Sequence, residues 1–120
     1  MNEQLLCYLP GPLGWSGTLE RICREEDVRI IRVSPARCGQ TLAALLGLLP
    51  AAAPSSAAAP REPVLVLCGF TRERMESFLD RLAREGVPPV LKAMVTPTNL
   101  GWSFSALAAE LAKERRQLEG

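Results

Sequence analysis

The sequence predicts an α/β fold in which four parallel strands form a small doubly wound sheet, in the order 2-1-3-4, with helices on both faces. Strand-like and helix-like segments alternate along the chain, which favours parallel strands joined by right-handed crossovers. Two of the four strand-like segments carry no charge, and the chain of 120 residues, the length of a single domain, contains an internal repeat. An α+β fold with a mixed sheet is the alternative.

Four short segments have the apolar composition of strands, and they span residues 5–9, 28–33, 64–68 and 90–95. The first and third contain no charged residue, as expected of strands buried on both faces of a sheet. The second contains Arg29 and Arg32, and the fourth contains Lys92. Charged side chains suit the edges of a sheet, so we expect the uncharged strands at the centre and the charged strands at the periphery.

Four amphipathic helices are expected between and after these strands. The first follows Thr18 and is the shortest. The third follows Phe70 and should stop at Gly86, because glycine readily takes the left-handed conformation that ends helices. The apolar stripes of the last three helices consist of Leu42, Leu45, Leu46 and Leu49, then Met75, Phe78, Leu79 and Leu82, and finally Phe104, Leu107, Ala108 and Leu111.

The repeat is clearest between residues 33–49 and 95–111, which align at a constant offset of 62 residues without a gap. Residues 19–25 and 79–85 resemble one another at an offset of 60. The longer match includes Val33 with Val95, Pro35 with Pro97, Gly39 with Gly101, Ala44 with Ala106, Leu45 with Leu107, and Leu49 with Leu111. Chance similarity of two amphipathic helices is the alternative, but the shared hydroxyl–proline pair and glycine argue against it.

The repeat predicts two copies of one βαβα unit within a single domain of residues 1–120. The first copy covers residues 1–49 and the second covers residues 63–118. Residues 50–62 are rich in alanine, proline and serine and too poor in large apolar groups to pack, so we expect a mobile linker between the copies.

The second copy resembles a bacterial domain family of unknown function. The resemblance covers roughly residues 62–117 and lies in V-L-V-L-C-G-F, an amphipathic helix, and then L-K-A-M-V-T-P-T-N-L-G-W-S-F. The family implies no activity, substrate or cofactor. The first copy departs from the motif at three positions, with Ile30 for Lys92, Arg37 for Asn99 and Gln40 for Trp102.

The segment from Thr96 to Trp102 is the candidate ligand-binding loop. The hydroxyls of Thr96 and Thr98, the amide of Asn99 and the N–H groups of the following helix can converge on an anionic or polar ligand. Trp102 would flank that ligand with its aromatic face, and Lys92 would supply a cation. The alternative is purely structural, because the same residue types turn a strand into a helix and cap the local N–H groups.

The position of this site follows from the predicted topology. In open parallel sheets, ligands bind beyond the carboxyl ends of the strands where the strand order reverses. We therefore expect a crevice between strands one and three, lined by residues 9–15 and 68–71, where Gly69 lets a ligand approach the backbone.

Several functional classes have little support in the composition. The chain has no histidine, which excludes Ser–His and Cys–His nucleophiles within one chain, and its four cysteines form no C-x-x-C pair, so neither a metal site nor a cofactor is expected. The formal charge of +1 and the dispersed basic residues argue against nucleic acid as a partner. The longest apolar run is too short to cross a membrane and the start is a poor signal peptide, so we expect a cytoplasmic protein.

Together these features predict a non-catalytic ligand-binding or regulatory module that uses the loops at the carboxyl ends of its strands. A protein–protein interaction or self-associating module is one alternative. A thiol-dependent enzyme is another, with Cys68 as its nucleophile if the following helix lowers the pKa of the thiol. A buried strand-end cysteine is the competing interpretation of Cys68.

Overall fold

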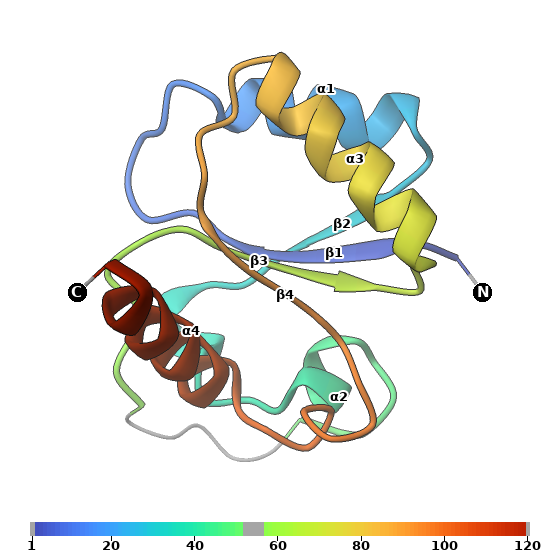
Figure 1. Cartoon of the computed structure of the whole chain (residues 1–120). Helices are drawn as coiled ribbons and strands as arrows, with labels where there is room; N and C mark the ends of the chain where they lie inside the picture. Colours follow the sequence, from blue (N-terminus) through green and yellow to red (C-terminus); the bar gives the residue numbers. More distant parts are fainter. Residues whose placement is uncertain (1, 52–56, 120) are drawn as a thin grey trace.

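The computed structural model describes residues 2–51 and 57–119, and its helices lie on both faces of a single sheet (Figure 1). The elements are, in chain order, β1 (Gln4–Tyr8), α1 (Ser16–Glu25), β2 (Arg29–Arg32), the 3-10 helix η1 (Pro35–Arg37), α2 (Leu42–Leu45), β3 (Val64–Cys68), α3 (Arg72–Arg84), β4 (Leu91–Met94) and α4 (Phe104–Glu119). Helices α1 and α3 cover one face of the sheet, and α2 and α4 cover the other. No helix in the described part of the chain is long and apolar enough to cross a membrane.

The strands have the predicted order, β2-β1-β3-β4, with the two charged strands at the edges. β1 is parallel to β2 and β3 is parallel to β4, but β1 and β3 are antiparallel. The prediction that all four strands are parallel is therefore wrong. The alternative, a mixed sheet in an α+β fold, fits the structure.

The crossover rule fixes the relative direction of the strands in the β1–β2 and β3–β4 pairs, but it leaves the direction of β3 relative to β1 open. A helical crossover joins β1 to β2 and β3 to β4, and both of these pairs are parallel as the crossover rule requires. The connection between β2 and β3 is instead long and contains η1 and α2. An uncharged strand buries both faces equally well in either direction, so neither the connection nor the composition selects one.

The antiparallel junction places matching residues of the two predicted copies opposite each other. Leu6 pairs with Val66 at the middle of the β1–β3 ladder, and these residues correspond at the offset of 60. Near the start of α4, Thr41 and Ser103 form an antiparallel bridge, and they correspond at the offset of 62. Both pairs support the predicted duplication, which stays a prediction.

Two apolar layers hold the sheet between its helices. The layer under α1 and α3 contains Leu19, Ile22, Phe78 and Leu82 packed on Leu5, Cys7, Leu65 and Leu67. The layer over α2 and α4 contains Leu42, Leu45, Phe104 and Leu107 packed on Leu6, Tyr8, Val64 and Val66. Both central strands therefore bury their two faces, as their uncharged sequences predict.

Of three helix boundaries that were predicted, the end of α3 agrees with the structure, and the start of α1 and the end of α2 differ from it. Helix α3 begins after Thr71, whose hydroxyl accepts the N–H of Arg74, and ends before Gly86, which takes a φ of 97° as predicted. Helix α1 begins at Ser16, earlier than the predicted start after Thr18. Helix α2 is much shorter than predicted, because Gly47 takes a left-handed φ of 80° and ends it. Of the predicted linker, residues 52–56 lie outside the described part of the chain.

Candidate functional site

The turn between β4 and α4 is held by hydrogen bonds within itself. The side-chain oxygen of Asn99 accepts the backbone N–H of Thr96 at 2.8 Å, and the Thr96 hydroxyl accepts the N–H of Asn99 at 3.1 Å. The amide Nδ2 of Asn99 donates to the carbonyl of Met94 at 2.9 Å. Asn99 is only 9% exposed. Its polar atoms are therefore engaged by the chain, which favours the structural interpretation of this residue.

The other members of the predicted loop lie on the surface around this turn. Thr96 and Thr98 are exposed, and Trp102 is 39% exposed, so Trp102 does not belong to the core. The backbone N–H of Trp102 donates to the carbonyl of Asn99 at 2.9 Å. Ser103 then caps α4, because its hydroxyl accepts the N–H of Ala106 at 3.1 Å. The predicted ligand contacts thus share a turn, but only their outer members remain open to solvent.

The predicted crevice between strands one and three does not exist. Because β3 runs antiparallel to β1, the loop of residues 9–15 lies at the opposite end of the sheet from Gly69. Gly69 and Thr96 do lie at the same end, since β3 and β4 are parallel. At Gly69 a Cβ atom would stand 2.6 Å from the carbonyl oxygen of Asn2. The chain itself therefore occupies the space that was expected to admit a ligand.

The cysteines lack the acidity that a nucleophilic thiol requires. Burial raises the pKa of the Cys68 thiol, the opposite of the shift that the enzyme alternative needs. Burial also raises the pKa of Cys7 to about 11 and that of Cys23 to about 12. All four thiols are free. Within the described residues no cluster of three or more metal-ligating side chains is present.

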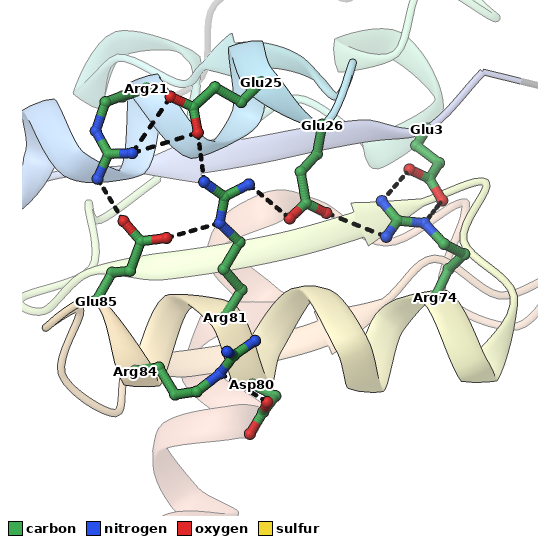
Figure 2. Close-up of polar contacts among 9 residues, drawn as sticks. All are labelled: Glu3, Arg21, Glu25, Glu26, Arg74, Asp80, Arg81, Arg84 and Glu85. Atoms are coloured by element: carbon green, nitrogen blue, oxygen red, sulfur yellow. Dashed lines mark hydrogen bonds and ion pairs between the residues drawn. The ribbon is translucent and has the colours of Figure 1, made fainter.

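The largest polar network ties α1 to α3 and leaves little charge uncompensated (Figure 2). Arg21 on α1 pairs at 2.5 Å with Glu85, the residue that follows α3, and Arg81 on α3 pairs with Glu25 on α1. These four residues correspond pairwise at the offset of 60, so the two cross-helix pairs are matched. Side-chain hydrogen bonds from Arg21 and Arg81 lower the pKa of Glu85 to about 2.

A second part of this network fixes the start of β1. Arg74 binds both carboxylate oxygens of Glu3, at 2.8 and 2.9 Å, and also contacts Glu26 at 3.1 Å. Arg81 contacts the other oxygen of Glu26 at 2.9 Å. Because each arginine in the network meets carboxylates of its own chain, we interpret the network as a structural clamp between the halves rather than as a ligand site.

Strand β4 lies at one edge of the sheet, so among the described strands it pairs only with β3. Val95 donates its backbone N–H to Leu67 on β3 at 2.8 Å. Peptide groups alternate in direction along a strand, so those of Lys92 and Met94 point away from β3. The carbonyl of Met94 is taken by Asn99, which leaves both backbone groups of Lys92 and the N–H of Met94 facing outward.

Apolar hollows flank this edge on both faces of the sheet. On the α3 side, one hollow of about 300 Å³ lies beside Leu79 and Val90, and one of about 220 Å³ lies beside Met75 and Met94. On the α4 side, a hollow of about 310 Å³ is lined by Leu91, Leu111 and Leu118, among others. Lys92 borders all three.

A larger hollow, of about 450 Å³, lies between residues 57–62 and α4. Its wall on the helix consists mostly of alanines, with Arg116 at one end. The segment that closes it adjoins residues 52–56, which lie outside the described part of the chain. Its polar lining consists of Arg61, Glu62, Ser105 and Arg116, and Glu62 is paired with Arg115 at 2.6 Å.

The half of the fold that carries the turn, Lys92 and the open edge consists of β3, α3, β4 and α4. Residues 63–118 match the model of a domain of unknown function, DUF3783. The DUF3783 match covers slightly less than half of the chain and confirms the resemblance for the second half. No curated protein and no solved structure matches the chain. Within the fold, the DUF3783 segment supplies two strands, and β1 from the first half pairs with its inner strand.

The open edge was not among the predicted sites, although Lys92 was. The stripe of α3 predicted from sequence includes Met75 and Leu79, and both are only partly buried because they overhang β4. The sequence predicted the edge position of β4, but it did not show how far the apolar stripe of α3 extends beyond that strand, because this depends on how the helix packs on the sheet.

Proposed function

We propose that the protein is a non-catalytic protein-binding module that takes up an extended segment of a partner along the free edge of β4. The observation that carries this proposal is the combination of outward backbone groups at Lys92 and Met94 with apolar hollows on both faces of the same strand. Addition of a strand to an exposed sheet edge uses these two elements, because main-chain bonds supply affinity and side-chain pockets supply specificity.

The backbone contribution comes from three groups. A segment lying beside β4 can exchange two hydrogen bonds with Lys92 and accept a third from the N–H of Met94. Asn99 limits the added strand at this end, since its amide already holds the Met94 carbonyl at 2.9 Å. The predicted loop thus supports the edge by marking where pairing stops, without itself contacting a small ligand.

The side-chain contribution comes from the hollows. Side chains of an extended segment point alternately to its two faces, so every second residue would enter the α3 side and the others would enter the α4 side. Full burial of one aliphatic side chain contributes about 1.5–3 kcal/mol. Hollows of about 220 to 310 Å³ suit side chains of this size. Leu118, which is 89% exposed, lies at the rim of the α4-side hollow and would become covered.

The opposite edge is less suited to the same role. Strand β2 exposes Arg29 and Arg32, and Arg32 is held by Glu20 of α1 at 2.7 Å. At the matching positions of β4 stand Leu91, which is buried, and Met94, which borders a hollow. Lysines and arginines on an edge discourage pairing, and β2 carries two of them where β4 carries one. Of the two edges, β4 therefore has the more favourable composition for an apolar partner.

Small-ligand binding by the Thr96–Trp102 loop has weaker support. Asn99 is buried and its amide is bonded within the turn, and Gly69 faces the chain's own Asn2. A thiol-dependent activity is weaker still, because the pKa of Cys68 is raised by burial.

Selection of random peptides displayed on phage against the full chain tests the proposal. Peptides that are enriched should bind the wild type and lose about tenfold in affinity for Met94→Pro, which removes one outward N–H and obstructs the edge. The matched control is Arg32→Pro at the corresponding position of β2, which should bind as the wild type does. Thermal unfolding establishes that both variants are folded.

Amide hydrogen exchange in the wild type keeps the test decisive if Met94→Pro does not fold. Bound peptide should slow exchange at Lys92 and Met94 and leave the β2 edge unchanged. The proposal is wrong if no peptide is enriched, if enriched peptides bind Met94→Pro and Arg32→Pro equally well, or if protection appears elsewhere.

A further inference from the structure

We infer that the segment bound at β4 carries an acidic residue opposite Lys92, between two apolar residues at alternate positions, all three facing α3. The partner is therefore an extended segment with the pattern apolar, any, acidic, any, apolar. This inference rests on the proposed function and specifies its partner.

The spacing follows from the edge itself. Alternation along the strand places Val90, Lys92 and Met94 on the α3 side, where Val90 and Met94 contact the apolar layer. One hollow lies beside Val90 and Leu79, and the next lies beside Met94 and Met75, with Lys92 lining both. A partner strand in register would place a side chain opposite Lys92 and its second neighbours over the two hollows.

The charge follows from what surrounds Lys92. Among the described side chains, no carboxylate lies within ion-pair distance of its Nζ atom, whose hydrogen bond is to the carbonyl of Val90 at a long 3.5 Å. The acidic residue that lines the nearer hollow, Asp80, is already paired with Arg84 at 3.0 Å. A strand laid over the edge removes water from the Lys92 ammonium, and that cost is offset when the strand supplies a carboxylate.

On the α4 side of β4, the partner segment is expected to carry a different kind of residue. There the hollow includes Glu114, and Arg115 at the same hollow is paired with Glu62 at 2.6 Å. A carboxylate on the α4 side would meet Glu114 as a like charge. The acidic residue is therefore favoured at the position that faces α3 and disfavoured at its immediate neighbours.

Pairing with the β4 edge of a second copy of this chain does not meet the requirement. The residues of β4, Leu-Lys-Ala-Met, include no acidic side chain. Antiparallel pairing of two β4 edges would place Lys92 opposite Lys92 or opposite an apolar residue, and would leave both ammonium groups without a carboxylate. Lys92 thus disfavours pairing between two β4 edges and favours an acidic partner segment. Specificity is gained in this way when a contact that attracts one partner also repels another.

Three synthetic peptides of one length test the inference. They share two leucines at the outer positions and threonines between, and they carry glutamate, glutamine or lysine at the centre. Fluorescence polarisation should show that the wild type binds the glutamate peptide about threefold to tenfold more tightly than the glutamine peptide, and the lysine peptide least. Lys92→Glu should reverse this order. Lys113→Glu changes net charge equally from an exposed position on α4 and should preserve it.

The outcomes separate the inference from the proposed function. If all three peptides bind the wild type equally and lose affinity for Met94→Pro, strand addition stands and the acidic partner is wrong. If peptides from phage selection bind at β4 but the glutamate peptide does not, the inferred pattern is wrong. If no peptide of either origin binds, both are wrong. A dimer in sedimentation that Met94→Pro abolishes would identify a second copy as the occupant and overturn the inference.

Discussion

Thr41 and Ser103 face each other in an antiparallel bridge, and the hydroxyl of each caps the helix that follows it. Around this pair the backbone bonds are reciprocal, since Leu42 donates to Trp102 at 3.0 Å and Phe104 donates to Gln40 at 2.9 Å. At the offset of 62, Thr41 matches Ser103, Leu42 matches Phe104 and Gln40 matches Trp102. The bridge therefore joins the two halves through residues that match in the predicted repeat.

Loss of either capping hydroxyl should destabilise the fold to a similar extent. Each accepts an N–H at 3.1 Å, from Ala44 or from Ala106, and an alanine at a cap typically costs about 1 kcal/mol. Urea denaturation of Thr41→Ala and Ser103→Ala measures this. Thr98→Ala removes an exposed hydroxyl and should change stability by less than about 0.5 kcal/mol. If Thr41→Ala and Ser103→Ala changed the free energy of unfolding as little as Thr98→Ala, the capping hydroxyls of the bridge would contribute nothing to stability.

Asn99 is expected to act on stability. Substitution to alanine removes the two hydrogen bonds of the side chain and leaves the N–H of Thr96 and the carbonyl of Met94 without their partner, so we expect a loss of about 2–3 kcal/mol. Asn99→Asp keeps an acceptor for Thr96 and loses only the donor to Met94, so its cost should be smaller. Chemical denaturation distinguishes the two. A fully stable Asn99→Ala would favour the ligand-binding interpretation of the turn.

Gly69 should tolerate no side chain. It takes a φ of 82°, and a Cβ atom would approach the carbonyl oxygen of Asn2 to 2.6 Å. We expect Gly69→Ala to cost more than the roughly 1–2 kcal/mol of a left-handed alanine alone. Gly11→Ala isolates that conformational cost, because Gly11 has a φ of 68° with no atom near. Equal unfolding free energies for the two variants would mean that the N-terminal residues move away freely.

The α1–α3 clamp should make stability depend on pH in the acid range. Arg21 and Arg81 hold the pKa of Glu85 at about 2, below its ordinary value of 4.5. The carboxylate therefore contributes its full stabilisation above about pH 4.5, and that contribution is lost as the pH falls toward 2. Denaturation midpoints of Glu85→Gln should fall less steeply in this window than those of the wild type. Glu114→Gln removes a carboxylate outside the clamp and should retain the wild-type slope.

The sequence predicted what depends on local pattern and missed what depends on strand direction. Charged Arg29, Arg32 and Lys92 correctly identified the edge strands, and α3 follows Phe70 and stops before Gly86 as expected. The direction of β3 could not be predicted, because its connection from β2 is long, with only the short helices η1 and α2 in it, and because its residues are apolar on both faces.

For the candidate sites, too, the residue types could be recognised in the sequence, but the roles of these residues depended on the tertiary structure. Thr96, Asn99 and Gly69 were selected for residue types that suit a ligand, but such types equally suit a turn that satisfies its own N–H groups. Lys92 was interpreted correctly as an edge residue. Its position between two hollows depends on how far α3 overhangs β4, which is a matter of tertiary packing.

The antiparallel junction of β1 and β3 also determines how the chain folds. Each βαβ half forms its own parallel pair from segments close in sequence, but the centre of the sheet joins Leu6 to Val66 across the whole intervening chain. Closing so long a loop is entropically slow, and neither central strand is shielded on both sides until it happens. The halves should therefore unfold in a single cooperative transition, with formation of the β1–β3 ladder limiting the rate of refolding.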